Sequence, residues 1–305
     1  MTLEEMADRI ASQPLQRSPF PYIVADDVLP PHILTGLRQW WPGAETFSPE
    51  TPGNYTSDPR TLVSENSGAG LFWSHFTRDV APVIARASLG HFAEWIIARY
   101  GPVARRIVAS KFRLMQADPS YAGIPCHAHH WQAPTWCVTL LLYVDQEADG
   151  HQGTTLHALT SAHGVPSLDV ASRFAARSLH GNRDRGSTWN GSGLMDEYTA
   201  NYKGNRLIAF LDGPLSYHSV KPVDTVGHST RRVFRVHLGM PRTDLLYQLL
   251  YGVTEQGYVS RRVHGADDPG VIAWLRRDIA QVWQTSPSLS AHVRARWTKS
   301  LKLTL

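Results

Sequence analysis

Apolar residues recur along the chain with two different periods, and the change of period divides the sequence. Helical spacing prevails near the N-terminus, where one apolar stripe follows Pro30 and Pro31 and another lies within residues 83–100. Thr2, with Glu5 three residues later, has the spacing of a capping box. We therefore expect three helices in the first hundred residues.

Two stretches of this N-terminal part lack the helical period. Residues 22–24 form a short apolar run after a proline pair, which predicts a strand. Residues 45–70 are rich in Pro, Gly, Ser and Asn, a composition that predicts an irregular loop.

The period changes to that of strands between Ile107 and about Gly239. β-branched and aromatic residues form four runs, at residues 107–114, 136–144, 206–211 and 232–238. A polar segment at residues 161–201 interrupts them and is longer than an ordinary loop, so we expect it to cover a site or to carry short helices.

Helical spacing returns after Pro241. Asp268 followed by Pro269 predicts a helix start, and an apolar stripe continues to Val282. The whole pattern predicts an all-β core with flanking helices (α+β) in one compact domain. Its three parts are a helix-and-loop buttress at 1–104, the core at 105–240 and C-terminal helices at 241–305.

Composition narrows the class of protein. The chain has 305 residues, of which 42% are hydrophobic and 18% charged, as in folded globular proteins. Lys and Arg total 30 against 26 Asp and Glu, but no run of five basic residues occurs, so we expect small anionic ligands rather than nucleic acid as partners.

Targeting and redox signals predict a cytoplasmic protein without a membrane partner. The N-terminus lacks a basic and apolar signal sequence, and no apolar run reaches the length of a membrane span. Cys126 and Cys137 are the two cysteines, and neither belongs to a Cys-x-x-Cys pair, so we expect no disulfide framework.

Histidines carry the chemical signal. His127, His129 and His130 lie within four residues just before the apolar run at 136–144, and His218 ends a later apolar stretch. Imidazoles from two strands that meet at one point are typical of a transition-metal site with open coordination positions. A solvated loop, or a zinc site with Cys126 or Cys137, is the alternative.

Four pieces of sequence, in order, resemble the iron(II)- and 2-oxoglutarate-dependent oxygenases, particularly prolyl-hydroxylase-like bacterial members. They are residues 20–30 (FPYIVADDVLP); the histidine cluster with 138–143 (VTLLLY); 153–156 (GTTL); and 205–210 (NRLIAF) with 217–223 (YHSVKPV) and 231–234 (RRVF). The resemblance implies a double-stranded β-helix, a jelly roll of the cupin type.

The resemblance also implies cofactors and residue roles. Fe(II), 2-oxoglutarate and O2 are the implied cofactor and cosubstrates, and His218 corresponds to the distal histidine ligand. An arginine about a dozen residues further on binds the far carboxylate of 2-oxoglutarate in the family. Arg232 is our first choice, and Arg231 is the alternative because a slip of one residue exchanges the faces of a strand.

The carboxylate of the family's metal site is missing. One register uses His127, twelve residues before Thr139, and places His129 where the family has Asp. The other register uses His130, nine residues before Thr139, and places Gln132 there. We favour His127, so the candidate metal ligands are His127, His129, His218 and His130, with His127 and His218 as the catalytic pair.

The predicted activity is oxidation of a C–H bond in a small or carrier-bound metabolite by a non-haem dioxygenase with an atypical iron site. A halogenase on the same scaffold is the first alternative, since the related halogenases replace the carboxylate with Ala or Gly. A cupin-like binding protein that has lost catalysis is the second.

Overall fold

The structure is a computed structural model of the whole chain. It describes residues 1–100, 106–129, 136–145, 153–159, 194–213, 216–221, 230–239 and 291–305. Residues 161–193 of the predicted covering segment, and residues 241–290 with the helix expected after Pro269, lie outside the described residues. The rest of the covering segment differs from the prediction, because Leu194–Ala200 forms a strand of the smaller sheet.

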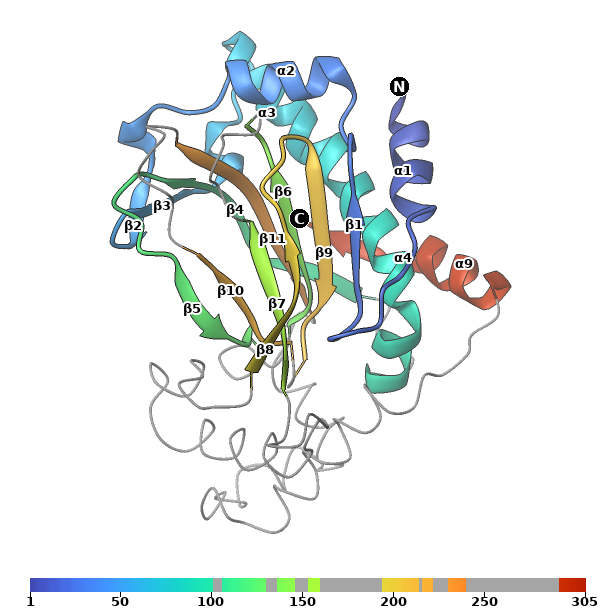
Figure 1. Cartoon of the computed structure of the whole chain (residues 1–305). Helices are drawn as coiled ribbons and strands as arrows, with labels where there is room; N and C mark the ends of the chain where they lie inside the picture. The colour runs from blue at the N-terminus through green and yellow to red at the C-terminus, as the bar shows by residue number, and fades with distance from the viewer. Residues whose placement is uncertain are drawn as a thin grey trace, which may run out of the picture.

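Two antiparallel sheets form the centre of the molecule (Figure 1). The larger has the order β1-β9-β6-β11-β4-β3-β2, with β12 added in parallel to β4. Its strands are β1 (Tyr22–Ala25), β2 (Ser48–Thr51), β3 (Asn54–Ser57), β4 (Arg106–Ala117), β6 (Trp136–Tyr143), β9 (Arg206–Leu211), β11 (Arg231–Gly239) and β12 (Lys302–Thr304).

The smaller sheet has the order β5-β10-β7-β8. Its strands are β5 (Ile124–His127), β7 (Thr154–Leu159), β8 (Leu194–Ala200) and β10 (His218–Val220). These results confirm the predicted β core with flanking helices.

Helices cover the outer face of the larger sheet. They are α1 (Leu3–Ala11), α2 (Pro31–Gln39), α3 (Gly68–His75), α4 (Ala81–Tyr100) and α9 (Ala291–Ser300), with short turns η1 (Ala44–Thr46), η2 (Pro59–Leu62) and the π-helical η3 (Phe76–Val80). The predicted capping box is present, since the Thr2 side chain accepts a hydrogen bond from the Glu5 backbone and Glu5 bonds back to Thr2. None of the helices that the structure describes has the length and apolarity to span a bilayer.

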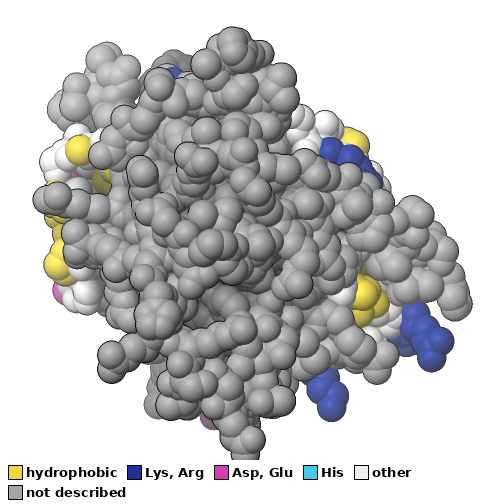
Figure 2. All heavy atoms as spheres, turned by 90° about the horizontal axis from the view of Figure 1, so that it is seen from below, with side chains coloured by type: hydrophobic (Ala, Val, Ile, Leu, Met, Phe, Trp, Pro, Cys, Tyr) yellow, Lys and Arg dark blue, Asp and Glu magenta, His cyan; other side chains and the backbone are white. Residues whose placement is uncertain are grey.

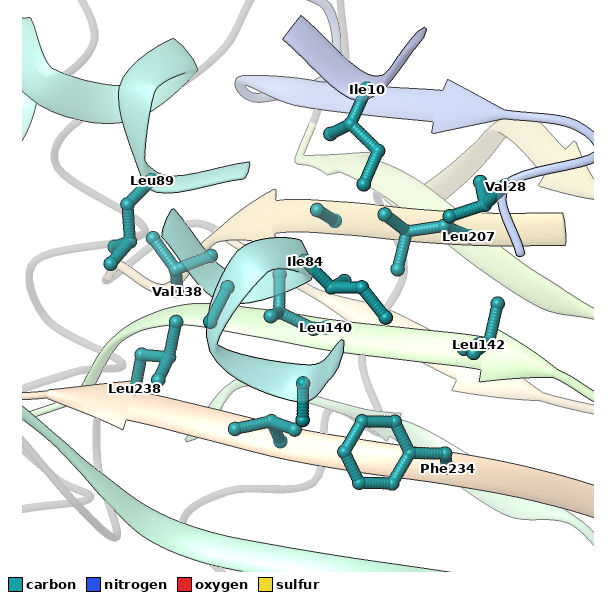
Figure 3. Close-up of a cluster of buried hydrophobic side chains, with 14 of the residues drawn as sticks. Ile10, Val28, Ile84, Leu89, Val138, Leu140, Leu142, Leu207, Phe234 and Leu238 are labelled. Carbon is teal, nitrogen blue, oxygen red and sulfur yellow. The ribbon is translucent and has the colours of Figure 1, made fainter. Parts of the chain in front are cut away.

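The main hydrophobic core lies between α4 and the larger sheet. Figure 3 shows Ile84 of α4 above Leu140 of β6, with Phe234 and Leu238 of the neighbouring strand β11 beside them. All four side chains are almost fully buried. Burial of this apolar face, which favours folding by about 25 cal/mol per Å², fixes which side of β6 and β11 points toward the helices.

The segment at 45–70 differs from the predicted loop. It contains β2 and β3, a hairpin that pairs with β4 at the edge of the larger sheet. β2 is exposed along its whole length and contains Pro49, which is tolerated at an edge because it donates no ladder hydrogen bond. Such a strand has no apolar alternation, and this is why the sequence pattern did not predict it.

Two motifs distant in sequence meet at the start of β9. Asn205 bonds to both backbone groups of Leu29, accepting from the Leu29 N–H at 2.7 Å and donating to the Leu29 carbonyl at 3.0 Å. Arg206 makes two hydrogen bonds to the Asp26 carboxylate. These contacts attach the N-terminal strand β1 to β9, so the first hundred residues contribute to the core sheet as well as covering it.

On the face shown in Figure 2, the visible Lys and Arg side chains form separate groups rather than one continuous area.

Candidate metal centre and cosubstrate pocket

Three histidines meet between the two sheets. His127 ends β5 and pairs with His218 at the start of β10, while His129 lies two residues beyond the strand. The ring centroids are 4.3 Å apart for His127 and His218, and 4.5 Å apart for His129 and His218. One nitrogen from each ring lies within 4.8 Å of the others, so the three rings can contact one ion.

The tautomer of each ring is set by an acceptor on its Nδ1 side. His127 Nδ1 lies 2.9 Å from the Pro125 carbonyl oxygen, and His218 Nδ1 lies 2.9 Å from the Ser216 carbonyl oxygen. His129 Nδ1 lies 3.0 Å from Asp212 Oδ1. Carbonyl and carboxylate oxygens only accept, so each Nδ1 carries the proton and each Nε2 presents a lone pair.

The Nε2 atoms of His127 and His129 are 3.2 Å apart. With both Nδ1 atoms protonated, this contact joins two lone pairs and is unfavourable unless a cation lies between them. Nitrogens bound to one ion at about 2.1 Å lie about 3.0 Å apart at a right angle and about 3.4 Å apart at the tetrahedral angle. The donor set and its spacing therefore fit a metal ion.

Burial keeps these imidazoles in the neutral form that binds metal. It lowers the pKa of His127 and lowers the pKa values of His129 and His218 well below 6.5. The positive charges of Arg235 and Lys111 act in the same direction on the pKa of His129. No proton has to be displaced for a metal to bind at neutral pH.

A second layer of polar residues surrounds His129, and the sequence pattern did not predict it. Asp212 is fully buried and also accepts a hydrogen bond from the Thr139 hydroxyl at 2.6 Å. The Thr139 oxygen lies 2.9 Å from His237 Nδ1. His237 therefore belongs to this network, and burial lowers its pKa well below 6.5.

A pocket with an empty volume of about 570 Å³ opens beside the histidines. Both sheets contribute to its lining, with Ile124 and Val220 from the smaller sheet and Met115, Leu141 and Val233 from the larger. Part of this space is open to solvent, and the combination of apolar lining with a few polar side chains is typical of sites for small molecules.

Arg231 lines the pocket and is 5% exposed. Its guanidinium lies over the rings of Tyr143 and Tyr202, at 5.5 and 5.6 Å. Within the described part of the chain its Nε has no hydrogen-bond acceptor and no carboxylate forms an ion pair with it. A buried cation in this state fits an anionic ligand, because an unpaired buried charge is costly.

Arg232, our first choice for binding the cosubstrate, points to the opposite face of β11. It lies over Trp41 at 5.7 Å and 3.8 Å from Asp145, and it does not line the pocket. Successive residues of a strand point to opposite faces, so the placement does not support Arg232 in that role and does support the alternative, Arg231.

A second arginine, Arg235, lines the pocket two positions further along the same face of β11 from Val233. Unlike Arg231 it has a partner, since its Nη2 donates to both oxygens of Glu50, at 2.8 and 2.9 Å. Glu50 also accepts from Lys111. Arg235 therefore has a carboxylate partner, which it shares with Lys111, whereas no carboxylate pairs with Arg231 within the described residues.

The second register and the two cysteines complete the set of predicted residues. His130 and Gln132, the second register, lie outside the described residues. Cys137 donates to the Leu238 carbonyl oxygen on the core side of the sheet, and neither cysteine belongs to a possible ligand group in the described part of the chain.

Comparisons with known proteins give likeness in overall structure only. No protein-family profile matches the sequence, and no curated protein matches it. A prolyl hydroxylase from Trichoplax adhaerens, solved with a peptide fragment, is 13% identical, and the match covers 78% of this chain and 90% of that one with a TM-score of 0.48.

Two bacterial structures give similar values. A prolyl-4-hydroxylase from Pseudomonas putida is 13% identical, with 79% and 100% coverage of the two chains and a TM-score of 0.40. An oxidoreductase of the 2OG-Fe(II) oxygenase family from Burkholderia pseudomallei is 9% identical, with 79% and 91% coverage and a TM-score of 0.43. TM-scores below 0.5 do not establish a common fold, so the chemistry of the site depends on its own side chains.

Proposed function

We propose that this protein is a non-haem Fe(II)- and 2-oxoglutarate-dependent oxygenase on a double-stranded β-helix. The convergence of three lone-pair nitrogens, from His127, His129 and His218, is the observation that carries the proposal. It supports the register of His127, and in this proposal His129 is the third ligand.

Iron, when bound, would supply the activation of O2 that is coupled to decarboxylation of 2-oxoglutarate. The three imidazoles would hold the ion, and their Nδ1 hydrogen bonds keep the rings oriented before it arrives. A neutral third ligand leaves one more positive charge on the centre than a carboxylate does, which favours anionic ligands.

Arg231 would bind the far carboxylate of 2-oxoglutarate. A guanidinium donates two parallel hydrogen bonds to a carboxylate, and the Tyr143 and Tyr202 rings restrict its position. The apolar side chains Met115, Leu141 and Val233 line the same pocket as this arginine and the histidines.

The substrate is proposed to be a small or carrier-bound molecule with an unactivated C–H bond. The apolar side chains that line the pocket beside the histidines support a substrate with an apolar reacting group. A halogenase is less well supported, because the position two residues after His127 holds an imidazole, His129, directed into the cluster rather than a vacancy.

Anaerobic titration tests the proposal. Fe(II) with 2-oxoglutarate should give a weak visible charge-transfer band that neither component gives alone, and both should raise the melting temperature. Substrate-dependent release of succinate would establish the oxygenase, and a chloride-dependent product mass would establish halogenation instead. No band and no thermal shift would contradict the proposal and favour a binding protein.

A further inference from the structure

We propose that Asp212 is a positioning residue that supplies, through His129, the negative charge that is absent from the ligand set. The proposal rests on the function proposed above, since it assumes that His129 binds the metal. The carboxylate would then lie one layer behind the metal instead of in contact with it.

Asp212 is held firmly at this place. It directly follows β9, its backbone N–H donates to the Cys137 carbonyl oxygen at 2.9 Å, and its side chain is fully buried. Both carboxylate oxygens are used, Oδ1 by His129 at 3.0 Å and Oδ2 by the Thr139 hydroxyl at 2.6 Å. A carboxylate bonded in this way cannot turn toward the pocket without breaking both bonds.

This carboxylate determines the positions of the protons around it. Because Asp212 only accepts, His129 must carry its proton on Nδ1, which leaves the Nε2 lone pair facing His127. The Thr139 hydroxyl donates its single proton to Asp212, so its oxygen accepts a hydrogen bond from His237 Nδ1. One acidic residue thus orients three neighbours.

Asp212 also distinguishes His129 from the other two rings. His127 and His218 donate to backbone carbonyls, which are neutral, whereas His129 donates to a carboxylate. A carboxylate on the distant nitrogen raises the basicity of an imidazole ligand and strengthens its bond to the metal, and loss of such a partner typically costs 10- to 100-fold in metal affinity. His129 with Asp212 therefore takes the place of a directly bound carboxylate.

A second arrangement of the same atoms is an ion held by His129, Asp212 and His237, whose ligand atoms also lie close together. The Thr139 oxygen lies between Asp212 and His237 and satisfies both by hydrogen bonds. The polar atoms of Asp212 and His237 therefore have hydrogen-bond partners without a cation. The Nε2 lone pairs of His127, His129 and His218 face one another and need one.

The Asp212→Asn substitution in the full chain is the first test. Affinity for Co(II) and, anaerobically, for Fe(II) should fall 10- to 100-fold against a competing chelator, and the Co(II) d–d bands should shift. Asp145→Asn is the matched control, because Asp145 is a partly buried carboxylate that follows β6 but pairs with Arg232. D145N should leave metal affinity and spectrum unchanged, and unchanged values for D212N would overturn the proposal.

The second test moves the carboxylate from position 212 to the ligand position 129. His129→Asp alone places two carboxylates side by side and should bind Co(II) more weakly than D212N. The double variant H129D/D212N places one carboxylate in the ligand position beside an amide that can donate to it, and should recover most of the parental affinity. A double variant no better than H129D would contradict the proposal.

A measurement on the parental protein keeps the proposal testable if D212N does not fold. With ¹⁵N-labelled histidine and Zn(II) as the probe, His129 should show the Nδ1–H tautomer with its Nε2 on the metal. The opposite tautomer, or zinc bound to Asp212, would overturn the proposal. Metal binding that depends on Asp212 without a 2-oxoglutarate band would contradict only the oxygenase function, and a band with no dependence on Asp212 would contradict only this inference.

Discussion

The two faces of β6 and β11 are both buried but differ in chemistry. The face toward α4 carries Leu140, Phe234 and Leu238, which belong to the main hydrophobic core (Figure 3). The face toward the smaller sheet carries Arg235 and His237, which are 8% and 1% exposed. Successive side chains of these strands therefore point in turn to the hydrophobic core and to the candidate site, and neither face of the strands is a solvent face.

The comparison shows that the apolar face stabilises the fold, whereas the polar face carries the residues of the candidate site. The outer face stabilises the fold by excluding water from apolar groups. The inner face buries polar groups, which is tolerated only where each finds a partner or a ligand. Substitutions on the two faces should consequently affect different measurements.

The largest expected effect is loss of metal binding from the inner side. His218→Ala and His127→Ala should each abolish Fe(II) binding at concentrations that saturate the parent, since each removes one of three converging nitrogens. Anaerobic equilibrium dialysis measures this. His130→Ala, the control for the other register, should retain the metal. Loss of metal in His130→Ala together with retention in His127→Ala would show that the His127 register is wrong.

On the outer face, Phe234→Ala should lower the free energy of unfolding by about 3–5 kcal/mol, because Phe234 is a nearly fully buried ring that leaves a cavity. Urea unfolding of the metal-free protein measures this loss. The folded variant should bind Fe(II) with parental affinity. A large change in metal affinity would mean that the two faces are not separable.

Arg231→Gln should weaken 2-oxoglutarate binding by about 1.5–3 kcal/mol, roughly 10- to 100-fold, through loss of charged hydrogen bonds. Titration of the charge-transfer band measures the change, and Fe(II) affinity should be unaltered. Arg232→Gln, on the opposite face of the same strand, should have little effect. Equal losses for both variants would contradict the assignment.

The last prediction concerns how stability depends on pH. Burial lowers the pKa values of His129, His218 and His237 in the folded state, so the unfolded chain takes up protons first as pH falls through 6.5. The metal-free protein should lose stability from pH 7 toward 5, by about 1.4 kcal/mol for each pKa unit of each group. Urea midpoints at several pH values test this, and F234A should show the same slope. A urea midpoint that rises as the pH falls would contradict the claim that these buried imidazoles are neutral.

The sequence was informative wherever burial imposed a period. Apolar runs marked β4, β6, β9 and β11 because one face of each strand meets the core, and His127 and His218 stood out because they flank such strands. The choice between Arg231 and Arg232 could not be made from alternation, since both faces of β11 next to them are enclosed and polar residues occur on each.

Asp212 was missed for a different reason. An Asp-Gly pair after an apolar strand is typical of a turn, so its sequence context indicates a loop end and not a buried partner of His129. The signal for His237 was its phase, because it lies on the same side of β11 as Arg231 and Arg235. The shared face could be recognised as part of a site only once the structure had placed one of these residues in the pocket.

The most direct test of three imidazoles binding one ion is anomalous scattering at the iron edge, from crystals grown anaerobically with Fe(II). The predicted result is a single peak about 2.1 Å from the Nε2 atoms of His127, His129 and His218, with Asp212 outside the coordination sphere. The absence of a peak there, or a peak between Asp212 and His237, would contradict the account.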